Sequence, residues 1–88
     1  MWRVIAGQSL RYREWGDEAV LFNDLSGATH LLGPAALCLL EHLRAGPAGD
    51  DALADALRVA FEVDEEELAV ELAGLLDGLA RLDLIEPC

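Results

Sequence analysis

The segment 18–32 constrains the fold of this chain more than any other part of the sequence. Two apolar runs flank the turn-forming residues Asp24 to Gly27, a pattern that predicts two β-strands joined by a turn. Gly33 and Pro34 follow directly, and proline suits the first turn of a helix. Ala28–Leu32 is therefore the last strand before the helical part, and an edge strand unless a later segment pairs with it. Such an edge offers backbone N–H and C=O groups to an extended peptide.

One further strand is predicted upstream of this segment. Residues 9–15 alternate apolar or aromatic side chains with arginines, as expected of a half-buried strand that runs from Ser9 to Trp15. Gly16 and Asp17 form the turn into Ala19–Phe22. This next strand is apolar throughout, which is typical of a central strand covered on both faces. The three strands together predict a β-meander.

The remaining sequence predicts three helices. The first covers about 34–44 and ends in the glycine- and proline-containing linker 45–49. Asp50 or Asp51 caps the second helix, whose apolar pattern reaches Phe61. Each helix places its leucines on one side, so the three helices are expected to share one core.

The third helix is the longest, and it carries two parallel stripes of apolar residues. Asp64 and Glu67 have the spacing of a capping box, and the helix extends to about Leu82. Its expected core stripe consists of Leu68, Leu72, Leu75, Leu79 and Leu82. A second, smaller stripe consists of Ala69, Ala73, Leu76 and Ala80. Small side chains would let another backbone come close, but alanine is also a good helix former, and the sequence alone favours that simpler explanation.

The order of these elements predicts an α+β domain of winged-helix type, with a three-stranded antiparallel β-meander followed by three α-helices. A chain of 88 residues has room for one modest core. We expect a single domain over residues 1–88, with strands in about 9–32 and helices in about 34–82.

The charge of the chain excludes some partners. The net charge is −11, and residues 33–88 hold three arginines against thirteen acidic residues. An acidic helical half repels a phosphate backbone, which argues against a winged-helix DNA-binding regulator, the main alternative for this fold. No apolar run approaches the ~20 residues of a membrane span, and the first residues lack the apolar region of a signal peptide. We expect a cytoplasmic protein that binds neither nucleic acid nor membrane.

Groups that carry out catalysis are scarce in the sequence. Cys38 and Cys88 are far apart and form no metal-binding motif, and no phosphate-binding loop is present. The histidines, His30 and His42, lie in no nucleophilic or metal-ligating pattern. His30 either makes a cross-strand polar contact or lines a binding groove. We expect no enzyme activity, no metal and no cofactor.

Several segments resemble the PqqD-like peptide chaperones, also described as recognition elements for ribosomally made, modified peptides. The segments that carry the resemblance are Trp2–Val4, Leu10–Trp15, Asp17–Val20, Ser26–Leu32, Val63–Leu68 and Leu82–Glu86. Within the family, they are most similar to the branch found with HPr-related kinases of the A type. Gly33 departs from the family pattern, which often has Asn, Ser or Asp at this helix cap.

The resemblance implies a peptide-binding function. In this family the leader segment of a precursor peptide adds as a further strand to the third strand, and its side chains rest against the third helix. Carried over by position, with the helix face taken from the helical wheel, the implied peptide-binding residues are Ala28, Thr29, His30, Leu31, Leu32, Ala69, Ala73, Leu76 and Ala80. The implied partners are a leader peptide and a modifying enzyme or HPr-related kinase of the same gene cluster.

A structural dimerisation domain remains a further alternative, because two copies can pair through the same edge strand. We expect a monomer or a homodimer.

Overall fold

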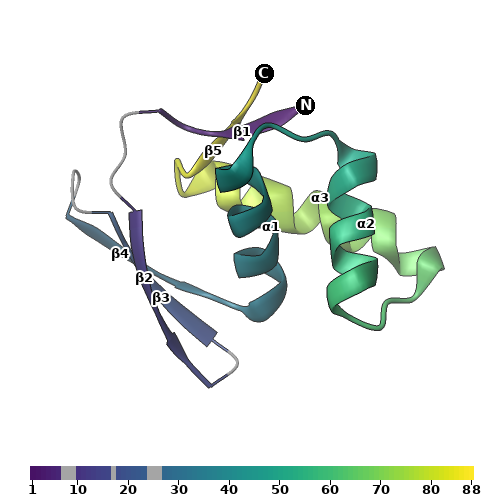
Figure 1. Ribbon diagram of the computed structural model, residues 1–88, viewed down its shortest axis with the longest axis horizontal. Coiled ribbons are helices and arrows are strands. Elements are labelled where there is room, and N and C mark those ends of the chain that lie inside the picture. Colours follow the sequence, from purple (N-terminus) through teal and green to yellow (C-terminus); the bar gives the residue numbers. More distant parts are fainter. Residues whose placement is uncertain (7–9, 17, 24–26) are drawn as a thin grey trace.

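The computed structural model describes residues 1–6, 10–16, 18–23 and 27–88, leaving aside the side chains of Leu10 and Trp15. A three-stranded sheet precedes three helices, and a small two-stranded sheet joins the two ends of the chain (Figure 1). The elements are β1 (Trp2–Val4), β2 (Leu10–Trp15), β3 (Glu18–Asn23), β4 (Ala28–Leu32), α1 (Pro34–Ala45), α2 (Asp50–Ala60), α3 (Glu65–Arg81) and β5 (Ile85–Pro87). The predicted α+β class, with its antiparallel meander and three helices, is confirmed.

The large sheet has the strand order β2-β3-β4. Both pairings are antiparallel, with Tyr12 opposite Leu21 and Leu21 opposite His30. Gly16 and Gly27 have φ of 64° and 75°, the left-handed conformation that glycine adopts at no steric cost. Five predicted positions lie outside the described residues: the strand start at Ser9, Asp17 in the first turn, and the turn positions 24–26.

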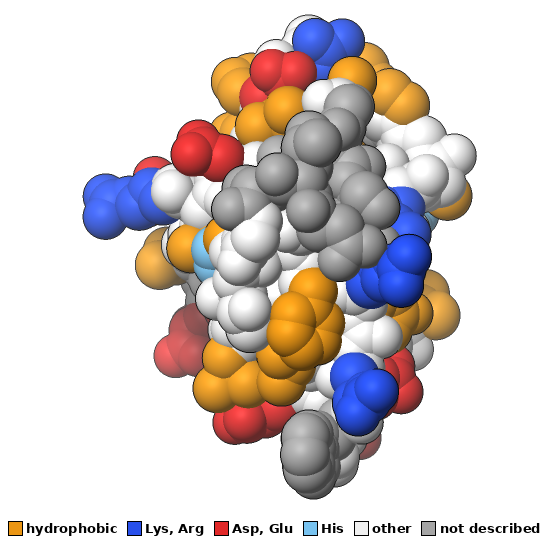
Figure 2. All heavy atoms as spheres, turned by 90° about the vertical axis from the view of Figure 1, so that its left-hand side faces the viewer, with side chains coloured by type: hydrophobic (Ala, Val, Ile, Leu, Met, Phe, Trp, Pro, Cys, Tyr) orange, Lys and Arg blue, Asp and Glu red, His pale blue; other side chains and the backbone are white. Residues whose placement is uncertain are grey.

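The helices cover one face of this sheet, because all three lie on the same side (Figure 1). Ala19, Leu21 and Leu32 are buried beneath them, whereas Phe22 remains 41% exposed. The prediction that Ala19–Phe22 is covered on both faces is therefore wrong: its apolar run is continuous, but only alternate side chains reach the core. Figure 2 looks at the molecule from the sheet side and shows apolar side chains beside arginines on this surface.

The core is a single cluster made largely of leucines from all three helices and the inner face of the sheet. Leu39, Leu40 and Leu43 give α1 its central place between the sheet and the other two helices. At the start of α3, the Asp64 side chain accepts a hydrogen bond from the Glu66 N–H at 3.0 Å, as predicted for a cap.

The predicted cap of α2 is wrong. Gly49 is the N-cap, and Asp50 and Asp51 are the first helical residues. There the carboxylates complement the positive end of the helix dipole. Asp50 also accepts a hydrogen bond from Trp2 Nε1 at 3.1 Å, which links β1 to α2.

The small sheet was not predicted from the sequence. β1 and β5 pair antiparallel, with Val4 opposite Ile85. Trp2 also exchanges two backbone hydrogen bonds with Ala48, at 2.8 and 3.0 Å. β1 therefore lies between β5 and the linker that joins α1 to α2.

None of the described helices is both long enough and apolar enough to cross a membrane.

The small sheet should matter for stability because Ile85 of β5 is only 1% exposed and belongs to the core. We expect Ile85→Ala to lower the free energy of unfolding by about 2–4 kcal/mol, measured by urea denaturation. The control is Val59→Ala in α2, where Val59 is 90% exposed and the change should stay within about 0.5 kcal/mol. Equal effects of the two substitutions would show that β5 does not stabilise the core.

Candidate functional site

The edge strand β4 is the first part of the candidate site. Within the described part of the chain, β4 pairs with β3 along one edge, and its other edge has no neighbouring strand. Its side chains alternate between half-buried or buried positions and exposed ones, and Leu31 is 66% exposed. The predicted edge strand is therefore present, with the predicted bounds Ala28–Leu32.

A groove lies between the end of β4 and helix α3. Its volume is about 410 Å³, and carbon atoms make up most of its surface. β4 contributes Leu31 and Leu32, and α1 contributes Ala36. The side formed by α3 consists of Gly74, Leu75, Gly78, Leu79 and Arg81, with Leu82 just beyond the helix. We call this hollow the β4–α3 groove.

Two glycines leave part of the α3 side of the β4–α3 groove without side chains. Gly74 and Gly78 are one helical turn apart, and a Cβ atom added at either would meet no heavy atom within 4 Å. They therefore make no room for another part of this chain. Glycine inside a helix costs about 1 kcal/mol relative to alanine. Here the pair leaves open space beside the edge of β4 that pairs with no described strand.

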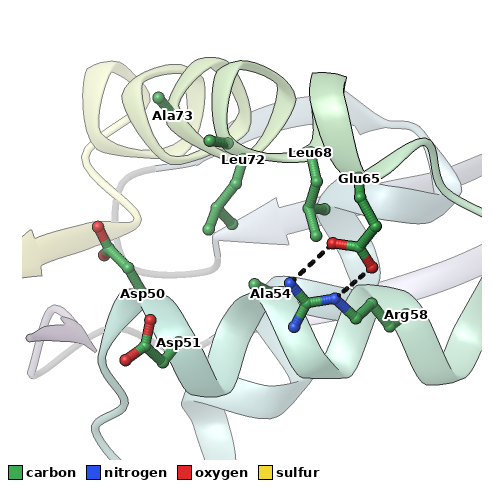
Figure 3. A pocket seen from close by; sticks show the side chains of 9 residues that line it. Asp50, Asp51, Ala54, Arg58, Glu65, Leu68, Leu72 and Ala73 are labelled. Atoms are coloured by element: carbon green, nitrogen blue, oxygen red, sulfur yellow. Dashed lines mark hydrogen bonds and ion pairs between the residues drawn. The ribbon is translucent and has the colours of Figure 1, made fainter.

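The structure does not bring all of the sequence-predicted binding residues to this groove. Ala69 and Ala73 line a different hollow between α2 and α3, of about 250 Å³ (Figure 3). Leu76 is only 3% exposed and belongs to the core, and Ala80 packs against that core. These four residues lie on another face of α3 from the two glycines.

The predicted core stripe of α3 was wrong at two positions, Leu75 and Leu82. Leu76 rather than Leu75 completes the buried stripe with Leu68, Leu72 and Leu79, and Leu82 is 37% exposed. With Leu76 in the core, Leu75 and the two glycines lie on the side of α3 that borders β4. The signal that sequence reasoning missed was the pair Gly74 and Gly78 inside a helix of otherwise strong helix formers.

His30 lies on the inner face of β4, half-buried and opposite Leu21 of β3. It is not among the residues that line the β4–α3 groove. The residue opposite His30 on β3 is the apolar Leu21, so it cannot supply the predicted polar cross-strand contact.

A cluster of interacting charges lies at the α2–α3 hollow. The Arg58 guanidinium donates two hydrogen bonds to the Glu65 carboxylate, at 2.7 and 3.0 Å (Figure 3). It donates another to Asp55. These hydrogen bonds stabilise the ionised form and lower the pKa of Glu65. The three side chains are largely exposed, so the contacts join α2 to α3 at the surface and contribute little to stability.

Tyr12 and Cys38 also have shifted pKa values, and neither shift favours catalysis. A hydrogen bond to the Glu41 carboxylate stabilises the neutral phenol and raises the pKa of Tyr12, which links β2 to α1. Burial raises the pKa of the Cys38 thiol, so this cysteine is held in its less nucleophilic form. Among the described residues, no three His, Cys, Asp or Glu side chains are grouped so that they could hold a metal ion.

Comparison with known proteins gives one family and two similar structures. The family described as coenzyme PQQ synthesis protein D (PqqD) matches residues 18–85, which run from β3 to β5. The structure of TbiB1 in complex with the TbiA(beta) leader peptide is 21% identical, with a TM-score of 0.73 over 98% of this chain and 96% of that one. The structure of lasso peptide synthetase B1 complexed with the leader peptide is 23% identical, with a TM-score of 0.70 over 98% of both chains. At these identities the similarity establishes the fold. Comparison with curated protein sequences finds no match.

The glycines of the groove predict an increase in stability on substitution. Gly74→Ala and Gly78→Ala should each raise the free energy of unfolding by about 0.5–1 kcal/mol, because alanine is the better helix former and its Cβ enters open space. Gly27→Ala is the matched control. It also meets no atom, but φ of 75° strains any residue with a Cβ, so this change should destabilise. A loss of stability at Gly74 or Gly78 would contradict the open groove.

The Arg58–Glu65 pair predicts a measurable change in ionisation. In Arg58→Gln, the pKa of Glu65 should rise toward its ordinary value, measured by NMR titration of the side-chain carboxyl. Because the pKa is lowered in the folded protein, the pair stabilises above the ordinary glutamate pKa, and this contribution disappears as the pH falls through the lowered value. Arg81→Gln removes a separate ion pair with Asp77 and should leave the Glu65 titration unchanged.

Proposed function

The chain belongs to the PqqD family, and on that basis we propose that it is a non-catalytic peptide chaperone. It binds the leader segment of a ribosomally made precursor peptide by β-strand addition and presents that peptide to a modifying enzyme. Residues 1–88 act as one peptide-binding domain. The observation that carries this proposal is the open edge of β4 beside the apolar β4–α3 groove.

Strand addition accounts for both parts of the site. An extended peptide would complete the backbone hydrogen bonds of β4, which supply affinity that depends little on sequence. Alternate side chains of a strand point to opposite faces, so every second peptide residue would face the helix side. Leu75 and Leu82 offer that residue an apolar surface, and Gly74 and Gly78 leave room for its bulk. The groove therefore supplies selectivity.

The similar structures support a leader peptide as the ligand. TbiB1 and lasso peptide synthetase B1 share this fold, and each of their structures is a complex with a leader peptide. This support is an analogy of fold, since one fold can serve several functions. The residues of the groove in this chain add the physical argument.

The partner proteins follow from the family role. We propose that a modifying enzyme or an HPr-related kinase encoded in the same gene cluster acts on the bound peptide. The protein works in the cytoplasm, where precursor peptides are made, as a monomer or a homodimer. The DNA-binding alternative gains no support, because α3 begins with three glutamates that would repel a phosphate backbone.

The proposal predicts where a peptide contacts the protein. Titration of isotope-labelled protein with the precursor peptide encoded beside the gene should shift the amide signals of β4 and those of Gly74 and Gly78. Gly78→Leu fills the groove and should weaken binding at least about tenfold, or ~1.4 kcal/mol. Ala69→Leu adds the same side chain on the α2–α3 side, at a position that the sequence assigned to binding, and should leave the affinity unchanged.

The two leucine variants separate the two faces of α3. If Ala69→Leu weakens binding and Gly78→Leu does not, the peptide uses the face predicted from the sequence rather than the β4–α3 groove. If the precursor peptide shifts no β4 amide, strand addition to this edge is wrong.

A further inference from the structure

The β4–α3 groove continues past the end of β4 into a second hollow, of about 220 Å³. Pro34 of α1, Phe61 and Val63 between α2 and α3, and Leu75 of α3 give it an apolar lining. Glu62 and Glu71 border the same hollow, and both side chains are exposed. We call it the α1–α3 pocket.

The α1–α3 pocket and the β4–α3 groove form one path along the surface. Leu75 lines both of them. Gly33 lines the groove and the next residue, Pro34, lines the pocket, at the point where the chain passes from β4 into α1. A chain that leaves the β4 edge at its Leu32 end therefore meets this pocket next.

The direction of the bound strand decides which part of a peptide reaches the pocket. Both pairings in the large sheet are antiparallel, and a strand that extends the sheet in the same manner runs from the Leu32 end of β4 toward Ala28. The residues that precede the paired segment then lie beside Gly33 and the α1–α3 pocket.

The charges around the pocket are not balanced within the described part of the chain. No described arginine forms an ion pair with Glu62 or Glu71. The arginines of the helices are engaged elsewhere: Arg58 with Asp55 and Glu65, and Arg81 with Asp77. Arg44 lies over the Tyr12 ring, 6.0 Å from its centroid. The net charge of −11 reinforces the negative potential here.

We infer that the α1–α3 pocket binds an arginine or lysine side chain of the peptide, from a residue N-terminal to the strand that pairs with β4. This inference rests on the proposed function. Long cationic side chains bury their aliphatic stems along apolar surface and keep the charged head in water. Phe61 and Leu75 provide that surface, and Glu62 and Glu71 accept the hydrogen bonds of the head group. A neutral apolar side chain would make no charge-assisted hydrogen bond to either carboxylate.

A displayed library of random peptides of about twelve residues tests this inference directly. The wild-type protein should select an alternating apolar segment preceded, at a fixed spacing, by Arg or Lys. Glu62→Gln combined with Glu71→Gln should still select the apolar segment but lose the preference for the cation. The matched control combines Asp51→Asn with Glu66→Gln. It removes the same charge at exposed positions that line neither the β4–α3 groove nor the α1–α3 pocket.

The Kd of one selected peptide, made with a fluorescent label, measures how much the two glutamates contribute to binding. The Glu62→Gln/Glu71→Gln variant should raise Kd about tenfold, and this difference should vanish when norleucine replaces the cationic residue of the peptide. The control variant should bind the two peptides with the same ratio of affinities as the wild type.

The outcomes separate this inference from the proposed function. If the wild type selects apolar segments with no cation at a fixed position, or if the control variant loses the cation preference equally, the pocket inference is overturned and strand addition stands. If the wild type selects no peptide that shifts β4 amides, the proposed function fails, and the pocket inference fails with it.

Discussion

Burial of one leucine-rich core on a single face of the sheet is the constraint on which the rest of the structure depends. Leu21 and Leu32 of the sheet pack with the leucines of α1, and α2 and α3 complete the same cluster. Because α1 follows β4 after one residue, it covers the sheet next to that strand. Helix α3 then packs against α1 and reaches the β4 side without covering the strand edge. The open edge and the groove beside it are consequences of how the core is filled.

Most of the fold could be predicted from the sequence because local signals agreed with the final packing. The bounds of β4, the start of α1 at Pro34 and the Asp64 cap of α3 all follow from turn, proline and capping chemistry. The family was also predicted correctly, from segments spread over nearly the whole chain. What local signals cannot express is pairing between distant segments. The sheet formed by β1 and β5 depends on Trp2 meeting both Pro87 and Ala48, contacts that no periodicity encodes.

The candidate site was predictable on its strand side and less so on its helix side. An edge strand follows from the element order, whereas the face that α3 presents depends on how the helix is rotated about its axis. Leu75 and Leu76 are adjacent and equally apolar, so their sequence context does not reveal which one is buried. Packing selects Leu76, and the face with Gly74 and Gly78 then borders β4. Ala69 and Ala73 of the predicted wall consequently line the hollow between α2 and α3.

The groove combines features that are each unfavourable for a free protein. Two glycines inside α3 together cost about 1–2 kcal/mol relative to alanine, and an open strand edge is a site for unwanted association. Neither feature improves the packing of this chain, since the space beside the glycines is empty. A bound peptide strand would pair with the edge and fill that space, so both costs would be offset only in the complex. Stability and binding therefore oppose each other at Gly74 and Gly78. An alanine there would give a more stable protein with less room for the peptide, which is the relation expected when a sequence retains a local weakness for function.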